Sequence, residues 1–423
     1  MKKLLHILII ILSITAYGQT NVSGGIFSNT TWTKANSPYI VTGDIAVYPG
    51  KTLTVEPGVI VKVNDDRRII IRGALIARGT VNDSIQFISN SSTPAKSKWV
   101  GFQIENNLGG RAKVEYFKGS HAYILFKITA NSTGEVLNIS HSSIINNYYA
   151  IYGYESMTSF TVSLTNTLFY DHFRVYTHCK NLNIDSCIFK KGAEAIHGDS
   201  NFTVNNSEFS EFTSSPTRTG GTYTNCKFYH NTNGLYLFPQ QHLINCEIFN
   251  NTNGIVLYYD TFPENFSISN TCLSNNTSYD IKHMYNYNID LSGVSWTETD
   301  PSVIANKIYD AYDDINMGIV NFSASNNCTL SPMGITDNIK NPTAIKIFPN
   351  PFSTQTTLQS DIYLNNATLS LYNSFGQSVK QIKNISGYTV TLQRDDIPSS
   401  VYILHLNDNN EIYLSTKLII TDK

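Results

Sequence analysis

The chain repeats itself at intervals of about 20 residues. Residues 225–234 read NCKFYHNTNG and residues 245–254 read NCEIFNNTNG, an almost letter-for-letter match at a distance of 20 residues. A period of this size indicates a repeat architecture, in which each unit buries its apolar side chains against the units before and after it. We therefore expect an elongated array of similar turns.

Extending the match in both directions gives columns of residues with the same character. An apolar column has a column of small residues two positions before it and a second apolar column seven or eight positions after it. Apolar and polar residues alternate within each unit, which is the period of a β-strand. The first apolar column is Ile144, Leu168, Ile188, Phe209, Phe228, Ile248 and Leu273; the small column is Ser142, Asn166, Ser186, Ser207, Cys226, Cys246 and Thr271; the second apolar column is Ile151, Val175, Ile196, Leu235, Ile255 and Ile281. The unit that contains Phe209 lacks a second apolar member, because residues 213–221 read as a loop.

Asparagine or aspartate marks one turn in most units, where its side chain can bond its own backbone. Cys226 and Cys246 belong to the small column, so we expect both to be reduced and buried, the commoner state of a free cysteine inside a protein. The six cysteines permit disulfides by their even number, but their positions in the repeat argue against a disulfide framework. The turn column is Asn147, Asp171, Asn231, Asn251 and Asn276.

Short strands, polar turns and stacked columns predict a solenoid of parallel strands. Both ends of the repeat region resemble bacterial right-handed parallel β-helix proteins, which have the pectate-lyase-like superfold. The resemblance implies an all-β, right-handed parallel β-helix over residues 19–325. Asp300 and Pro301 suit the N-cap and first turn of a short helix in a capping segment near 296–322. The segments that carry the resemblance are residues 37–43, 50–58, 73–80, 296–301, 308–314 and 318–322.

Residues 1–18 have the form of a signal peptide. Lys2 and Lys3 form a basic start, an apolar run covers residues 4–15, and small residues stand at the positions that a signal peptidase reads. This run is about 12 residues long, too short to cross a bilayer of roughly 30 Å as a helix. We expect cleavage before Gln19 and a mature chain without a transmembrane segment, secreted or held on the outer cell surface.

The composition changes after a polar segment at residues 326–344, which we interpret as a linker. Residues 345–423 resemble, over their whole length, the type A sorting domain of the type IX secretion system. The resemblance implies a small β-sandwich that the type IX secretion machinery recognises and removes, with release of the protein or attachment to surface polysaccharide. The motif residues are Pro349, Asn350, Pro351, Phe352, Gly376, Tyr402 and Lys417.

The charge balance excludes one class of partner. The chain has 30 basic and 32 acidic residues, without the basic surplus or stripe that is typical of nucleic-acid binders. We expect no nucleic acid among its partners, and we expect no cofactor.

Residues between the inward columns should point outward and stack from unit to unit at about 4.8 Å. This predicts an aromatic face with a polar patch at its centre, where sugar rings would lie on aromatic faces. His178 or His197 could act there as a base that Asp199 orients. Alternatively, the stacked aromatic residues only stabilise neighbouring strands. The predicted ligand-binding residues are Tyr152, Tyr154, Tyr176, Tyr236, Phe238 and Tyr258.

Two further groups of charged residues favour a structural interpretation. Glu208, Lys227 and Glu247 fall on successive units and suit a surface ion ladder better than an acid–base pair. The acidic residues near the cap could contribute to a calcium site, which needs several convergent oxygens, but simple turn capping is the favoured interpretation and we assign no metal. These acidic residues are Asp310, Asp313 and Asp314.

The favoured hypothesis is an exported β-helix protein that binds polysaccharide or another surface ligand without catalysis. The family resemblance implies that enzymes of this fold use acidic clusters with a basic residue, or several aspartates on neighbouring turns. Residues 197–199 (HGD) are only a fragment of such a pattern. The alternatives are a secreted polysaccharide lyase or glycoside hydrolase, and an adhesin with a protein partner.

Overall fold

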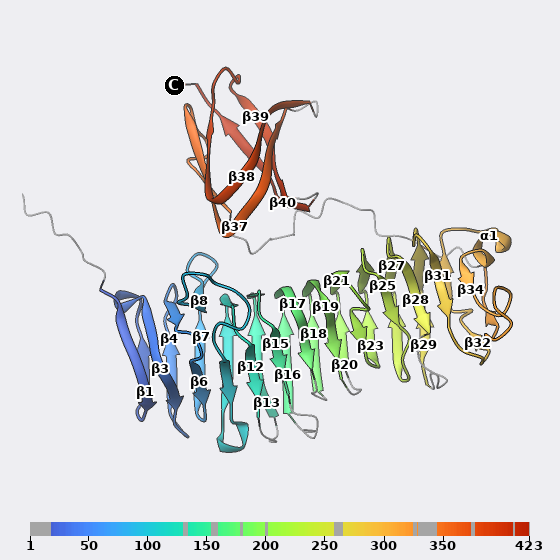
Figure 1. Cartoon of the computed structure of the whole chain (residues 1–423), viewed down its shortest axis with the longest axis horizontal. Coiled ribbons are helices and arrows are strands. Elements are labelled where there is room, and N and C mark those ends of the chain that lie inside the picture. Colours follow the sequence, from blue (N-terminus) through green and yellow to red (C-terminus); the bar gives the residue numbers. More distant parts are fainter. Residues whose placement is uncertain are drawn as a thin grey trace, which may run out of the picture. The chain divides into compact units, whose positions relative to one another are not determined.

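The chain forms two compact units, Met1–Leu330 and Ser331–Lys423, which we describe separately. The structure is a computed structural model (Figure 1). The predicted signal peptide, apart from Gly18, and all of the predicted linker except Cys328 lie outside the described residues. The structure describes residues 18–129, 134–153, 160–177, 181–198, 202–257, 265–324, 328, 345–373, 377–408 and 411–422.

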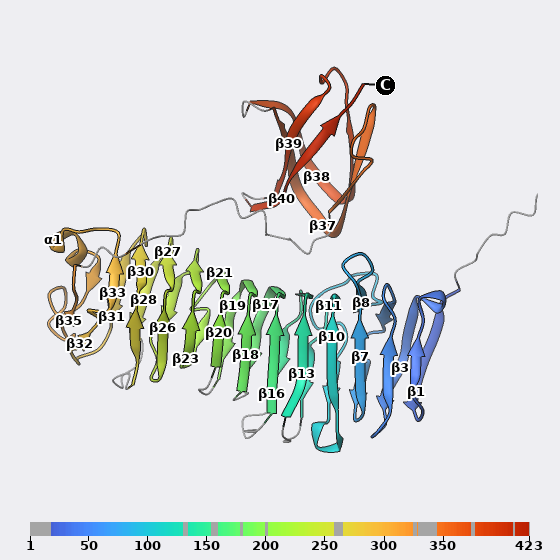
Figure 2. The ribbon, with the colours of Figure 1, turned by 180° about the vertical axis from the view of Figure 1, so that it is seen from behind.

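The first unit is a parallel β-solenoid, as the repeat predicts, and Figure 2 shows its strands stacked side by side from β1 to the segment around α1. Each turn of the solenoid, here called a rung, pairs in parallel with the rungs on either side. The strands of the largest sheet are β1 (Thr20–Ile26), β3 (Tyr39–Val47), β5 (Ile60–Val63), β6 (Arg68–Ile71), β8 (Ile85–Ser89), β9 (Gly101–Ile104), β11 (Phe117–Ser120), β12 (Ile124–Ile128), β14 (Ser143–Ile145), β15 (Tyr149–Tyr152), β17 (Leu168–Thr177), β19 (Ile188–His197), β21 (Glu208–Phe212), β22 (Thr217–Arg218), β24 (Lys227–Tyr229), β27 (Glu247–Phe249), β30 (Thr271–Ser274) and β33 (Val294–Trp296).

The remaining strands of the solenoid form three smaller sheets. An eleven-stranded sheet contains β2 (Thr30–Trp32), β4 (Thr52–Val55), β7 (Ala74–Arg78), β10 (Arg111–Glu115), β13 (Gly134–Ser140), β16 (Phe160–Thr165), β18 (Asn181–Asp185), β20 (Phe202–Asn205), β23 (Gly221–Thr224), β26 (Gln241–Ile244) and β29 (Ser267–Ser269). A four-stranded sheet contains β25 (Asn233–Tyr236), β28 (Asn253–Leu257), β31 (Tyr279–His283) and β34 (Ile308–Tyr309), and β32 (Ile289–Asp290) pairs with β35 (Val320–Asn321). The short helices are η1 (Lys34–Asn36), η2 (Asn106–Leu108) and α1 (Pro301–Ala305).

Aromatic rings stacked along the axis fill the middle of the core. Phe169, Phe189, Phe209 and Phe228 are fully buried, with successive ring centroids 5.0, 4.8 and 4.9 Å apart and nearly parallel planes. The alignment of the repeats in the sequence placed Leu168 in this column instead of Phe169. In the next unit it placed Ile188 in the column instead of Phe189. Since a strand alternates its faces, a slip of one residue exchanges the inward and outward sets.

The small column forms a hydrogen-bonded ladder at one bend. The backbone N–H of Ser142 donates to Oγ1 of Thr167 at 3.3 Å, and the N–H of Cys187 donates to Oγ of Ser207 at 3.1 Å. Thr167 and Cys187 therefore hold the places that the alignment assigned to Asn166 and Ser186, both of which are left-handed bend residues with positive φ. Cys187, Cys226 and Cys246 are free and buried, as predicted for the latter two. Burial raises the pKa of the Cys187 thiol to about 12.

A second ladder joins the rungs at the asparagine turn. Oδ1 of Asn147 accepts the N–H of Ala122 at 2.8 Å, and Oδ1 of Asn251 accepts the N–H of Asn231 at 2.9 Å. The amides of Asn147 and Asn251 also donate to carbonyls two residues back in their own turns. The column was therefore predicted correctly as a turn, and its side chains also bridge to the preceding rung.

His172 stands in this ladder where the alignment placed Asp171. Its Nε2 lies 2.9 Å from the carbonyl oxygen of Ile144, and its Nδ1 lies 3.3 Å from the backbone nitrogen and 3.2 Å from the carbonyl oxygen of Asn147. In the neutral imidazole with its proton on Nε2, Nε2 donates to Ile144 and Nδ1 accepts the N–H of Asn147. The ring is 1% exposed, and this burial lowers its pKa to about 4. Asp171 instead has φ 58° and pairs with Lys96, Oδ1 to Nζ, at 2.7 Å.

The last rungs end in the predicted cap. Asp300 is the N-cap of α1, where its side chain accepts the N–H of Ser302, and Pro301 is in the first turn, so the prediction for these two residues is confirmed. The positions of the cysteines in the repeat argued against a disulfide framework, but a disulfide between Cys272 and Cys328 joins the last rungs to the chain beyond the cap. Thr271 holds the inward position in this rung, so the neighbouring Cys272 is available for pairing.

The second unit has a core of its own and one antiparallel sheet. Breaks in register along the long strand β37 let the sheet close around buried residues that include Phe352 and Tyr402. The N–H of Ile419 donates to Oδ1 of Asn350 at 2.9 Å, which ties the beginning of the unit to its end. The strands are β36 (Lys346–Phe348), β37 (Gln355–Tyr372), β38 (Ser378–Gln393), β39 (Ser400–Asp408) and β40 (Glu411–Ile420).

The buried imidazole predicts a loss of stability in acid. The unfolded chain binds a proton at His172 near pH 6.5, whereas the folded chain resists it down to about pH 4. The stability from this difference is complete above pH 6.5 and is lost as the pH falls to 4, by about 3 kcal/mol. We expect His172→Asn to fold at pH 7, because other rungs have Asn at this position. Its free energy of unfolding, measured in urea, should not show this loss at pH 4. His230→Asn, at an exposed bend, is the control, and an equal acid loss in His172→Asn and parent would contradict the assignment.

Candidate functional site

One outward row of side chains crosses the middle of the largest sheet. The row contains Lys127 of β12, Tyr152 of β15, His197 of β19 and Arg218 of β22, and the backbone register between Tyr152 and His197 runs through the end of β17. Tyr152 and His197 were predicted for this face, and both are half-buried. Arg218, the cation at the β22 end of the row, was not predicted.

Tyr176 does not belong to the outward row. It pairs with Ile151 and Ile196 and is fully buried, so the prediction that it points to solvent is wrong. The reason is the one-residue slip at Leu168, which placed Val175 in the inward column. Tyr236 is 7% exposed, so the prediction that it is an exposed platform is also wrong, and the guanidinium of Arg218 lies over its ring at 5.7 Å.

The other predicted residues of the aromatic face divide into two groups. Phe238 is half-buried beyond the end of β25. Tyr154, His178, Asp199 and Tyr258 lie outside the described residues. The pairing of a histidine with Asp199 therefore remains a prediction.

A carboxylate held by three cationic or ionisable partners lies beside the outward row. Glu194 forms an ion pair with Arg174, Oε2 to Nε, at 2.7 Å, and it accepts hydrogen bonds from Arg218 at 2.9 Å and from Nδ1 of His197 at 3.0 Å. Its side chain is 5% exposed, whereas those of the two arginines and the histidine are 23–28% exposed. We call these four residues the Glu194 cluster; it spans three successive rungs.

The partners keep Glu194 ionised. Burial by itself raises the pKa of the carboxyl, but the hydrogen bonds from His197 and Arg218 and the charge of Arg174 outweigh burial and lower the pKa below its usual range. With two guanidinium groups around one carboxylate, the cluster has a surplus of positive charge. It can therefore attract an anionic group, and its half-exposed arginines can donate to carboxylate or sulfate oxygens.

Stacked aromatic residues flank the cluster on the side of lower residue numbers. Tyr123, Tyr148 and Phe173 stack in successive rungs with centroids 5.4 and 5.1 Å apart. Their faces cover one another, so this stack stabilises the rungs and is not a flat platform for sugar rings. Tyr149 stands edge-on to Tyr148 at 4.8 Å and pairs in register with Arg174, so an aromatic ring of different orientation adjoins the cluster.

Sequence reasoning missed Arg174, Glu194 and Arg218. The slip of one residue hid Arg174, and residues 213–221, read as a loop, contain β22. Thr217 of this strand pairs with Ile196 and supplies the inward member that the unit was thought to lack. A signal was present, because a correct register places Arg174 and Glu194 at paired positions of adjacent rungs.

The other charged groups have structural partners. Glu208, Lys227 and Glu247 occupy paired positions of successive rungs, and the ion ladder stays a prediction. Oε2 of Glu208 accepts from the hydroxyl of Tyr229 at 2.9 Å. Asp310 accepts the N–H groups of Tyr312 and Val320, both at 2.9 Å. Oδ2 of Asp313 accepts the N–H of Asp310, and Oδ1 of Asp314 accepts the N–H of Asn316. These carboxylates close turns, and the described residues contain no group of three His, Cys, Asp or Glu that could hold a metal ion.

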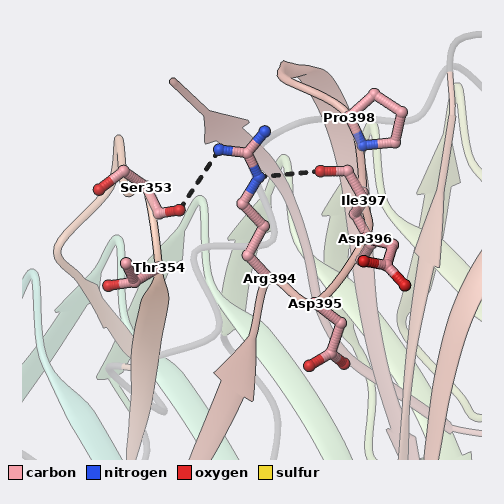
Figure 3. Close-up of a pocket in the computed structure, with 7 residues that line it drawn as sticks. All are labelled: Ser353, Thr354, Arg394, Asp395, Asp396, Ile397 and Pro398. Carbon is pink, nitrogen blue, oxygen red and sulfur yellow. Dashed lines mark hydrogen bonds between the residues drawn. The ribbon is translucent and has the colours of Figure 1, made fainter. Parts of the chain in front are cut away.

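A concave surface on the second unit surrounds Arg394 (Figure 3). The guanidinium donates to the carbonyls of Ile397 at 2.9 Å and of Thr421 at 2.8 Å, and it also pairs with Asp422 at 3.1 Å. Arg394 thus holds a turn and the end of β40 together. These bonds occupy the cation in the structure of this unit, so we do not interpret the concavity as a ligand site.

Comparison with known proteins identifies the second unit. Residues 346–421 match the family described as "Secretion system C-terminal sorting domain", so this part of the chain is a sorting domain, as predicted. Protein bark beetle of Drosophila melanogaster is 39% identical over 61 residues, or 14% of this chain, and the match spans about 2% of that protein. In the described part of the chain, no helix has the length and apolar character needed to span a membrane.

Two solved structures are similar to the chain at low sequence identity. The periplasmic alginate epimerase AlgG is 12% identical, with 70% of this chain and 77% of that chain covered and a TM-score of 0.33. The A-module of mannuronan C-5 epimerase AlgE6 from Azotobacter vinelandii is 10% identical, with 70% and 90% covered and a TM-score of 0.31.

The Glu194 cluster predicts a large effect of one neutral substitution. Glu194→Gln keeps the shape but leaves Arg174 and Arg218 without their shared anion, so we expect a loss of about 2 kcal/mol in urea unfolding at pH 7. The pKa of Glu194 is lower in the folded chain than in the unfolded chain. The contribution of Glu194 to the free energy of unfolding is therefore complete above pH 4.5 and is lost as the pH falls through the lowered pKa. Asp83→Asn removes an exposed pair with Lys34 and should cost under about 1 kcal/mol. Equal effects of the two substitutions would contradict a tightly held cluster.

Proposed function

We propose that this chain is an exported β-solenoid protein that binds an acidic polysaccharide at the Glu194 cluster without catalysis. The observation that carries the proposal is the pair of half-exposed arginines that share one buried carboxylate. A carboxylate or sulfate of the ligand would meet donors held in place by Glu194, and preorganised donors lose little entropy on binding. Tyr149 and Tyr152 on the adjacent rung supply aromatic and hydroxyl surface for a sugar.

The sorting domain supports the export part of the proposal. A secretion-system sorting domain at residues 346–421 implies that the chain is secreted. We propose that the type IX machinery is the partner that recognises it, and that the solenoid is released or attached at the outer cell surface. A binding site for acidic polysaccharide suits a protein that works outside the cell.

A second candidate function is polysaccharide cleavage by a lyase mechanism. The bond from Nδ1 of His197 to Glu194 orients the imidazole, and a histidine held in this way can transfer a proton through Nε2. Hydrolysis of a glycosidic bond typically uses two carboxyl groups, one of them protonated, whereas the cluster contains one carboxylate with a lowered pKa. The geometry therefore favours binding over hydrolysis, and a lyase is the alternative to test.

Binding can be measured by calorimetry with acidic polysaccharides such as polygalacturonate, alginate and hyaluronan, and with neutral dextran. We expect the parent to bind an acidic polymer, and Arg174→Gln or Arg218→Gln to weaken binding by roughly tenfold or more, because each removes charge-assisted hydrogen bonds. Arg111→Gln makes the same charge change on β10 of the other sheet and should bind as the parent does.

The same incubations distinguish the two candidates. Binding without catalysis predicts no new reducing ends and no unsaturated ends. Unsaturated ends that disappear in His197→Gln would establish the lyase instead. If the parent binds none of the acidic polymers, the proposed function is rejected.

Export can be tested by deletion of residues 345–423. We expect the truncated chain to remain in the periplasm, because the solenoid would lack the domain that the machinery recognises. Cell fractionation with antibodies against the solenoid measures the outcome, and a soluble periplasmic enzyme controls for leakage. Normal amounts of the truncated chain outside the cell would contradict the sorting role.

A further inference from the structure

The two ends of the solenoid are closed in different ways. At one end Ile304 of α1 is buried in the core, and the disulfide Cys272–Cys328 holds the chain that follows. The other end is formed by β1 (Figure 1) and β2. Within the described part of the chain, β1 pairs with β3 alone and β2 pairs with β4 alone, so each of these two strands has one edge without a strand partner.

The sequence of this open end does not contain the residues that usually protect a strand edge. Residues 18–33, which include β1 and β2, contain no charged residue and no proline. Exposed edges of monomeric proteins usually have lysine or proline, and the terminal units of repeat proteins usually have a polar cap, because an unprotected edge pairs with other chains. The edge of β1 is therefore suited to strand pairing with another molecule.

The apolar core is incompletely covered at the same end. Val22 and Ile26 of β1 pack against the core but are only half-buried, whereas Val41 and Val47, their register partners in β3, are fully buried. Phe27, directly after β1, is 65% exposed. One further rung placed over β1 would bury these side chains as β1 buries those of β3.

The backbone of β1 presents matching hydrogen-bonding groups on its free edge. A bend at Gly24, with φ 85°, divides the strand into two arms, residues 20–22 and 24–26. The first and last residues of β1 bond to the residues that flank β3. Since the N–H and C=O groups of successive residues in a strand point to opposite edges, those of Asn21 and Gly25 point away from β3. Each arm therefore offers one N–H and one C=O group to a new strand.

We infer that two copies of this chain associate through the β1 end, about a two-fold axis that passes through the bend. The first arm of each copy pairs antiparallel with the second arm of the other, so that Asn21 exchanges hydrogen bonds with Gly25 of the second copy. The two Ser23 side chains then lie beside the axis. Such an interface closes at two copies, and two uncharged edges meet without repulsion. The inference does not depend on the proposed function.

Sedimentation equilibrium on the chain from Gln19 onward, with the sorting domain retained, tests the inference. We expect the parent to be a dimer. Ser23 is exposed, so Ser23→Lys and Ser23→Glu should fold as the parent does, which circular dichroism checks. Each variant places two like charges beside the axis and should raise the dissociation constant of the dimer by roughly tenfold or more. An equimolar mixture of the two variants should dimerise again, because opposite charges then meet.

Thr203→Lys is the matched control. Thr203 is exposed on β20, in the middle of the other sheet, and this variant should dimerise as the parent does. The inference is overturned if the parent is a monomer at every concentration, or if Ser23→Lys dimerises as tightly as the parent. Particles that grow beyond two copies would also overturn it, since they require an interface that does not close. A mixture of Ser23→Lys and Ser23→Glu that stays monomeric would contradict the position of the axis.

Discussion

The backbone N–H groups at the bends of each rung must find acceptors beside a buried, apolar core. Side chains of the adjacent rung provide many of them: Asn147 and Asn251 at one bend, Thr167 and Ser207 at the other. An unsatisfied buried N–H costs on the order of 1–3 kcal/mol, so a rung that slipped by one residue would lose several bonds at once. These ladders, together with the stacked phenylalanines, set the register of the solenoid. Every outward row, including the one proposed to bind ligand, depends on that register.

The register brings together charges that are distant in the sequence. Arg174, Glu194 and Arg218 come from three strands, and only their stacking places two guanidinium groups around one carboxylate. Glu194 is buried and would be unstable without them, whereas the arginines keep exposed surface of their own. The buried anion thus stabilises a positively charged surface, an arrangement that suits recognition of an anionic polymer better than a neutral one.

Much of the fold could be predicted from sequence, since the period, the alternation and the Asn-rich turns all indicate stacked strands. The bends explain the asparagines: residues such as Asn166, Asn225 and Asn245 adopt the left-handed conformation that asparagine tolerates best, each directly before an inward small residue. The site was less predictable. Leu168 and Phe169 suit an inward position equally well by hydrophobicity, and the polar partner that distinguishes them is His172, a residue type that the predicted column of Asn and Asp turn residues does not contain. The sequence therefore predicted an exposed Tyr176, which is buried in the structure, and it did not indicate Arg174 as a site residue.

The central claim is that the ladders place a row of ligand-binding side chains along one outer face, centred on the Glu194 cluster. A crystal structure of the solenoid soaked with an acidic octasaccharide tests it most directly. The account predicts an ordered ligand on the outward face of β15, β17 and β19, with a carboxylate oxygen within hydrogen-bonding distance of Arg174 or Arg218. An octasaccharide ordered only on another face would contradict it.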